Sequence, residues 1–125
     1  MRRRALVTGG SGAIGSAICR RLAADGFEVV VHANRNLESA RQLAADIDGS
    51  AVGFDVVDAR ASLAALESVL EAGPIQVLVN NAGVHDDAAF PGMQREQWAR
   101  VIAVAIDGFY KTADAGMMDE EGYLY

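Results

Sequence analysis

Residues 5–15 read ALVTGGSGAIG and combine two local patterns. The first four residues, Ala5 to Thr8, are mostly apolar and lead into a glycine cluster, as a buried strand does when it enters a tight turn. A helical pattern follows at once, because Ile14, Ile18 and Leu22 are spaced four residues apart. The stretch therefore predicts a strand, a glycine loop and a helix in direct succession.

The glycine cluster matches a phosphate-binding pattern. Residues 10–15 (GSGAIG) fit G-x-G-x-x-G, and they lie between the predicted strand and helix, where this motif has its meaning. Glycines let the backbone approach a pyrophosphate, and a helix N-terminus offers free N–H groups and partial positive charge. The alternative is an ordinary glycine-rich turn. The agreement of strand, spacing and helix favours a dinucleotide site.

The same alternation of short apolar runs and amphipathic segments continues along the chain. Gly26 is placed to end the first helix, Asn36 and Asp58 are good N-caps for the next two, and Gly73-Pro74 stops the third. The third helix carries an apolar stripe of Leu63, Leu66, Val69 and Leu70. The patterns predict strands over 5–8, 27–33, 51–56 and 75–80, and helices over 15–25, 37–47, 58–72 and 95–109.

Strands separated by helices predict right-handed crossovers and a parallel sheet covered on both faces. We therefore expect an α/β fold of the Rossmann type, a doubly wound parallel sheet that stops after its fourth strand and the following helix. In such sheets the ligand crevice lies at the carboxyl ends of the strands. Residues 1–110 form the expected dinucleotide-binding half-domain, and 111–125 are an atypical tail in which Gly122–Tyr125 resemble the opening of a fifth strand.

The residues at the end of the second strand bear on the choice of cofactor. An NAD site places Asp or Glu there to bind the ribose 2′-hydroxyl, whereas this chain has His32, Asn34 and Arg35. A guanidinium fits a 2′-phosphate through charge-assisted contacts, so Asn34 and Arg35 favour NADP (NADPH). The alternative is a solvated arginine ahead of a helix cap.

Composition excludes several other classes. The chain has 51% hydrophobic residues, a formal net charge of −6 and pI near 4.7, which predict one acidic globular domain and no nucleic-acid partner. No apolar run approaches the ~18 residues of a membrane span. The single cysteine, Cys19, excludes a disulfide framework and a multi-cysteine metal site, and it fits a cytoplasmic protein.

Three segments in this order resemble the short-chain dehydrogenase/reductase family: TGGSGAIG at 8–15, Asp55-Val56, and NNAG at 80–83. Trp98 and the later segments 101–102 and 107–109 are similar to the 3-oxoacyl-acyl-carrier-protein reductase group, and the likeness covers about residues 4 to 110. The resemblance implies cofactor contacts in three places. The phosphate loop is Gly9, Gly10, Ser11, Gly12, Ile14 and Gly15, and the adenine pocket is Asp55 and Val56. The turn after the fourth strand is Asn81, Ala82 and Gly83. The alternatives are a carboxylate that caps the next helix and a turn that only closes the strand.

The chain departs from the family pattern in its chemistry. Ala105 stands where the family has an asparagine in its proton relay, and the family's Ser and Tyr-x-x-x-Lys are absent. Tyr110 and Lys111 are adjacent and cannot share a helix face, and the His85-Asp86-Asp87 cluster is more typical of a solvated loop. We assign no catalytic residue and no metal ligand. The sequence is interpreted as an N-terminal piece of a longer reductase or as the product of a frame lesion.

The resemblance implies an NADP(H)-dependent oxidoreductase that transfers hydride between NADPH and a carbonyl such as a 3-oxoacyl thioester, in fatty acid biosynthesis. This chain would hold the cofactor-binding part and be inactive alone. The alternatives are a non-catalytic dinucleotide-binding or regulatory module and a degenerate product. The apolar fourth strand, 75–79, would form an open sheet edge, so we also expect self-association.

Overall fold

The computed structural model describes residues 2–83, 95–96 and 99 of the chain. Strands and helices alternate, as expected, in the order β1 (Arg4–Val7), α1 (Ala13–Ala24), β2 (Glu28–Ala33), α2 (Leu37–Asp46), β3 (Ser50–Gly53), α3 (Ala59–Glu71) and β4 (Val77–Val79). Arg95, Glu96 and Ala99 are helical. The rest of the helix expected over 95–109 and the tail 111–125 lie outside the described residues.

The four strands form one parallel sheet in the order β3-β2-β1-β4. Ala5 in β1 is paired with Val29 on one side and with Val77 on the other. The chain first moves outward from β1 through β2 to β3 and then returns to the opposite side of β1. This reversal confirms the doubly wound α/β fold and places a topological switch point at β1, where ligands bind in open sheets of this kind.

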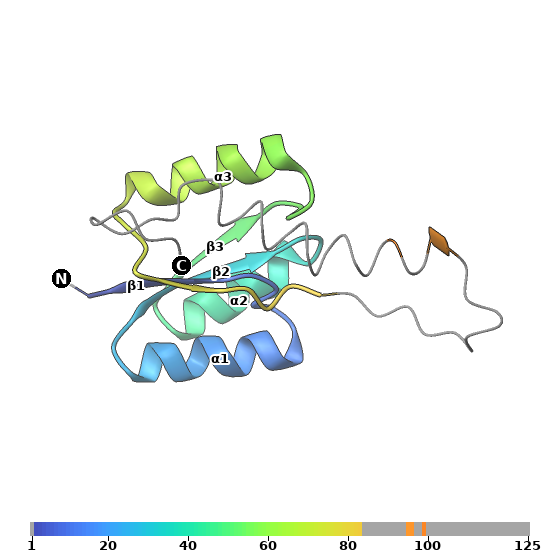
Figure 1. Cartoon of the computed structure of the whole chain (residues 1–125). Helices are drawn as coiled ribbons and strands as arrows, with labels where there is room; N and C mark the ends of the chain where they lie inside the picture. Colours follow the sequence, from blue (N-terminus) through green and yellow to red (C-terminus); the bar gives the residue numbers. More distant parts are fainter. Residues whose placement is uncertain (1, 84–94, 97–98, 100–125) are drawn as a thin grey trace.

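Helices cover both faces of the sheet, with α1 and α2 on one face and α3 on the other (Figure 1). Because side chains alternate along a strand, Val29 and Val31 of β2 pack toward α1 and α2, whereas Val30 packs toward α3. The run Val29–Ala33 is buried at every position, which confirms the sequence argument for a strand covered on both sides. The core is therefore divided into two layers by the sheet.

Arg4 closes the amino end of the sheet, and β1 begins with it, one residue before the prediction. Its side chain is buried, and its Nη1 donates hydrogen bonds to the backbone oxygens of Val69, at 2.9 Å, and Gly73. Its backbone N–H donates to Oε1 of Gln76 at 2.7 Å. These contacts hold the end of α3 and the start of the β4 segment against β1.

Two predicted apolar stripes are displaced in the structure. On α3 the buried positions are Ser62, Leu66 and Val69, whereas Leu63 is 46% exposed. Ser62 takes the inner position, where its hydroxyl donates to the Asp55 carbonyl at 3.2 Å.

The predicted N-caps are present in the structure. The Asn36 side chain accepts from the Ser39 N–H, and the Asp58 side chain accepts from the Ala61 N–H.

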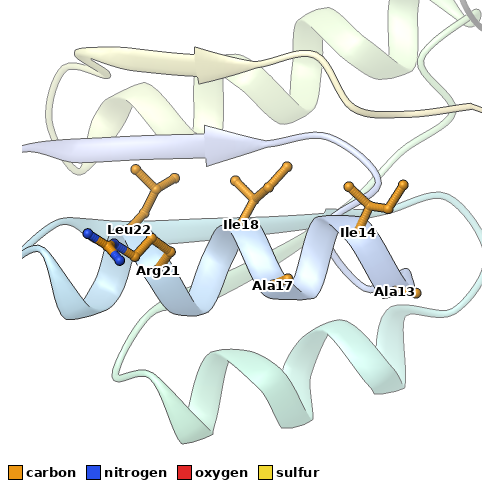
Figure 2. A pocket seen from close by; sticks show the side chains of 6 residues that line it. All are labelled: Ala13, Ile14, Ala17, Ile18, Arg21 and Leu22. Atoms are coloured by element: carbon orange, nitrogen blue, oxygen red, sulfur yellow. The ribbon is translucent and has the colours of Figure 1, made fainter.

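On α1 the fully buried residues are Gly15 and Cys19, and Ile14 is 71% exposed. Ile14, Ile18 and Leu22 lie in one row along the helix and line an apolar hollow of about 610 Å³ (Figure 2). The three residues therefore share one face of the helix as predicted, but only Ile18 and Leu22 pack against the described core. No helix in the described part of the chain is long and apolar enough to span a membrane.

Candidate functional site

The carboxyl ends of β1, β2 and β4 meet at the glycine loop that joins β1 to α1. Thr8 follows β1 directly, and residues 9–12 then lead into the first turn of the helix. Gly12 is the N-cap and carries no side-chain cap, so the first N–H groups of α1 have neither an intrahelical partner nor a capping side chain. Gly12, Ala13 and Ile14 are exposed, which leaves this end of the helix open to a ligand.

Thr8 fastens the turn after β4 to the end of β1. Its side chain accepts hydrogen bonds from the backbone N–H groups of Asn81, at 3.0 Å, and Ala82, at 3.1 Å. The Thr8 hydroxyl also lies 3.3 Å from the Val79 carbonyl, to which it donates, and the residue is 1% exposed. A buried hydroxyl that uses its donor and both acceptor positions fixes the two segments relative to each other.

Gly9 is held at both of its backbone groups, the N–H and the carbonyl. Gly9 has a φ of +63°, a left-handed conformation that favours glycine, and its N–H donates to Nδ1 of His32 at 3.0 Å. Its carbonyl accepts from the side-chain amide of Asn81 at 3.2 Å and from the backbone N–H of Gly12 at 3.3 Å. The orientation of the loop is thus set by side chains from β2 and from the turn after β4.

Gly15 lets the first turn of α1 cross the loop at contact distance. A Cβ at this position would lie 2.1 Å from the Gly9 carbonyl oxygen, which no side chain can tolerate without a shift of backbone. At Gly12, in contrast, the nearest heavy atom to an added Cβ would be 3.6 Å away, an ordinary contact. The protein itself therefore requires a glycine at position 15 but not at position 12.

His32 is a buried imidazole between two backbone groups of opposite polarity. Nδ1 faces the Gly9 N–H, and Nε2 lies 2.6 Å from the Phe54 carbonyl oxygen. Because the N–H can only donate and the carbonyl can only accept, the ring is the neutral tautomer with its proton on Nε2. Burial lowers its pKa from the usual 6.5, against the opposing effects of the Phe54 hydrogen bond and the Asp55 charge. The ring also packs on Phe54, with centroids 4.3 Å apart.

The residues expected to choose the cofactor lie at the end of β2. Asn34 and Arg35 are both exposed, and Arg35 makes no hydrogen bond or ion pair with any residue that the structure describes. The described residues thus leave the guanidinium exposed. The structure places both residues at the carboxyl edge of the sheet, directly after β2, the strand next to β1 and its glycine loop.

Asp55 and Val56 follow β3 at the same edge. Asp55 is half-buried, and its Oδ1 accepts from the Val57 N–H at 3.1 Å, while Asp58 caps α3. The alternative in which Asp55 caps the next helix is thus not what the structure shows. The Val56 side chain is buried in the α3 layer, so only its backbone can face a ligand.

In the turn after β4, Asn81 directs its side-chain amide toward Gly9, as described, and Ala82 packs against the α3 layer. Gly83 is exposed, and an added Cβ there would meet nothing within 4 Å. The structure therefore gathers the predicted residues of the loop and of this turn into one unit. Whether each contacts a cofactor stays a prediction.

Sequence reasoning missed Thr8 and His32 as parts of the site. Thr8 is part of the quoted motif but receives no separate role from the sequence. His32 enters the argument only because it is not a carboxylate. A histidine within an otherwise apolar buried strand was the available signal.

Burial raises the pKa of the Cys19 thiol to about 11, which agrees with a core residue and not a nucleophile. His85, Ala105, Tyr110 and Lys111 lie outside the described residues.

Comparison with known proteins identifies relatives of this chain. A family model described as short chain dehydrogenase matches residues 3–122. An acetoacetyl-CoA reductase of Rhizobium meliloti is 37% identical over 123 residues, which are 95% of this chain and 51% of the relative. A 3-oxoacyl-acyl-carrier-protein reductase of Aggregatibacter actinomycetemcomitans is 37% identical over 119 residues, 90% of this chain and 49% of the relative.

Among solved structures, a gluconate 5-dehydrogenase from Burkholderia cenocepacia, in complex with NADP and tartrate, superposes with a TM-score of 0.82 at 33% identity. The match covers 90% of this chain and 46% of that one. The chain spans about half the length of the curated relatives that it matches.

Proposed function

The chain belongs to the short-chain dehydrogenase family, and we propose that it supplies the NADP(H)-binding part of an oxidoreductase. The cofactor, when bound, accepts or donates a hydride, and the protein binds and orients it. The substrate proposed for the whole enzyme is a carbonyl compound such as a 3-oxoacyl thioester.

Gly9, which is held at both of its backbone groups, carries this proposal. Its N–H is fixed by His32 and its carbonyl by Asn81, so the loop needs little reordering when an anion arrives. Immediately after it, the exposed and uncapped start of α1 directs free N–H groups to solvent. An anionic pyrophosphate is the ligand that such a preformed loop and helix terminus fit, because both supply donors and partial positive charge.

The preference for NADP rests on Arg35. A free, exposed guanidinium at the end of β2 suits a phosphate on the 2′ position, and no carboxylate stands at positions 32–35 to bind the hydroxyl of NAD. Asn34 beside it can add a neutral hydrogen bond. Asp55 at the end of β3 can accept from the exocyclic amine of adenine, and the exposed Gly83 leaves room for the ribose or nicotinamide side.

The names of two relatives support the substrate class, since acetoacetyl-CoA and 3-oxoacyl-carrier-protein substrates share a 3-oxoacyl thioester. A role in fatty acid biosynthesis is part of the same proposal. A cytoplasmic location agrees with the buried, unpaired thiol of Cys19.

We test the function by titrating NADP⁺ and NAD⁺ into the 125-residue chain and into two charge-reversal variants. The first variant is Arg35→Asp. The matched control is Arg20→Asp, which makes the same change on an exposed arginine near the far end of α1. One charge-assisted contact predicts a preference for NADP⁺ of roughly tenfold to hundredfold, lost in Arg35→Asp and kept in the control.

The possible failures are distinct. Equal affinities of the wild-type chain for the two dinucleotides would remove Arg35 from its proposed role. The absence of binding of either dinucleotide, for a chain shown to be folded, would overturn the proposed function itself.

Self-association is proposed on the position of β4. Within the part of the chain that the structure describes, β4 is the outer strand of the sheet, and Val77, Leu78 and Val79 carry no charge. Such an edge is a template for pairing with another strand. Light scattering coupled to chromatography at roughly micromolar concentrations tests this, and a sharp monomer peak would contradict it.

A further inference from the structure

His32 joins the glycine loop to the residue that follows β3. Its side chain is 1% exposed and bridges the Gly9 N–H and the Phe54 carbonyl. A simple core position would have been filled by another valine, like the three residues that precede it in β2. The imidazole instead provides one acceptor and one donor at two backbone groups that no regular strand pairing satisfies.

We propose that His32 is a positioning residue of the dinucleotide site, whose bare Nδ1 holds the Gly9 peptide in its binding orientation and whose protonation releases it. The inference rests on the proposed function and adds to it a residue and a dependence on pH. His32 does not touch the ligand in this proposal; it acts through Gly9.

The geometry leaves no place for a second ring proton. Protonated Nδ1 would direct an N–H at the Gly9 N–H, now 3.0 Å away, and two donors would face each other inside the protein. Nε2 is already committed to the Phe54 carbonyl at 2.6 Å. Relief requires the Gly9 peptide to turn away, because the ring is enclosed in the core.

The charged neighbour of the ring does not stabilise its protonated form enough to offset burial. Among the described residues the charge that acts on His32 is the Asp55 carboxylate, which favours the protonated ring. Burial outweighs it, and one Asp55 oxygen already accepts from the Val57 N–H. The pKa of the ring is therefore lower than that of an ordinary histidine, and when the ring does take up a proton it does so at the expense of the Gly9 contact.

The effect is confined to the loop. The Gly10 N–H donates to the backbone oxygen of His32 at 2.8 Å, and this bond does not involve the ring. The pairing of β1 with β2 is also independent of the ring. Protonation thus changes the orientation of the Thr8–Gly9 peptide, whose N–H meets the ring. Through Gly9 it disturbs the next peptide, whose carbonyl accepts from the Asn81 amide.

The test uses two substitutions with different chemistry. In His32→Asn the side-chain oxygen can occupy the place of Nδ1 and accept from Gly9, but it does not titrate. In His32→Leu the acceptor is removed while an apolar volume is kept. The control is His85→Gln, which removes the only other histidine of the chain.

The measurement is the dissociation constant for NADP⁺ of each chain, from about pH 8 to about pH 5. We report it as the ratio of wild type to His32→Asn, so that titration of the ligand's own phosphate cancels. At the higher pH we expect a ratio near one and roughly tenfold weaker binding by His32→Leu. At the lower pH the wild type should weaken toward His32→Leu, with His85→Gln following the wild type. A ratio that stays constant over the whole range would overturn the inference.

A second readout needs no ligand. Nitrogen-proton correlation spectra of the His32 ring in the free chain should show a bare Nδ1 and a protonated Nε2 at neutral pH. The Gly9 amide signal should then move with the ring as it titrates, in a folded chain. A proton on Nδ1 at neutral pH, or a Gly9 signal indifferent to the ring, would overturn the inference. Absence of NADP⁺ binding at every pH would instead refute the proposed function and leave these spectra to judge His32.

Discussion

Replacement of Thr8 by valine removes a hydroxyl while keeping the shape of the side chain. The hydroxyl accepts from two backbone N–H groups, those of Asn81 and Ala82. The Asn81 N–H has a second acceptor, the Val79 carbonyl at 3.1 Å, which also keeps its bond from the Thr8 N–H at 3.0 Å. Thr8→Val therefore leaves one donor, the Ala82 N–H, without its partner.

An unsatisfied donor in a partly buried position costs about 1–3 kcal/mol of unfolding free energy. With a urea dependence of about 1–2 kcal/mol per molar, the unfolding midpoint should fall by roughly 1 M. The matched variant Thr8→Ser keeps the hydroxyl and loses one buried methyl group, a change of about 1 kcal/mol. The two variants thus separate the hydrogen bonds from the packing.

Urea unfolding and amide hydrogen exchange together form the assay. Exchange of the Ala82 amide should accelerate in Thr8→Val and stay slow in Thr8→Ser, because only the first loses the acceptor. NADP⁺ affinity should fall with it, since the turn that carries Asn81 is less well held. A Thr8→Val chain as stable as the wild type, with unchanged Ala82 protection, would refute the view that this hydroxyl joins β1 to the turn after β4.

Three further predictions concern single groups. Gly15→Ala should lower the free energy of unfolding by about 1–3 kcal/mol, because the new Cβ would meet the Gly9 carbonyl at 2.1 Å, whereas Gly12→Ser, with 3.6 Å of clearance and an N-cap hydroxyl, should be neutral or stabilising in the same urea titration. The lowered pKa of His32 means that the unfolded chain takes up its proton more readily. Its contribution to stability is therefore complete above about pH 6.5 and is lost as the pH falls through the folded pKa, so the unfolding midpoint of the wild type should fall relative to that of His32→Asn as the pH is lowered. The Cys19 thiol, with its pKa raised to about 11, should react with a thiolate-specific reagent roughly a hundredfold more slowly in the folded chain than in urea, and equal rates would show that it is not buried.

The order and type of the elements were predictable because the chain marks them locally. The apolar run of β2, the caps Asn36 and Asp58, and the left-handed Gly26 each act within a few residues. The strand boundaries were less so. The third strand was expected to reach Val56, but β3 ends at Gly53, because the buried Val56 belongs to a turn that Asp55 closes.

The inward face of each helix depended on partners that periodicity cannot identify. Ser62, and not Leu63, lies on the inner face of α3, where its hydroxyl donates to the carbonyl of Asp55 in the turn after β3. The helix sequence itself does not reveal that contact. The glycine motif was located correctly from its spacing. Spacing could not show that Gly15 is the position where a Cβ would meet the Gly9 carbonyl, or that His32 accepts from the Gly9 N–H, because both depend on contacts made in the fold. Spacing predicts the loop; only the fold shows what orients it.

The pairing of β1 with β4 also orders events in time. Thr8 and Asn81 are 73 residues apart, and Asn81 and Gly9 are 72 apart, so the loop of chain between them must close before either contact exists. Closure of such a loop is slow relative to the pairing of β1 with β2. During synthesis the β1-α1-β2 unit can therefore form early, with the Gly9 N–H already on His32, while the Gly9 carbonyl awaits the turn after β4. A chain that ends before Asn81 therefore carries the glycine motif but lacks the donor to the Gly9 carbonyl and the partner of the Thr8 hydroxyl.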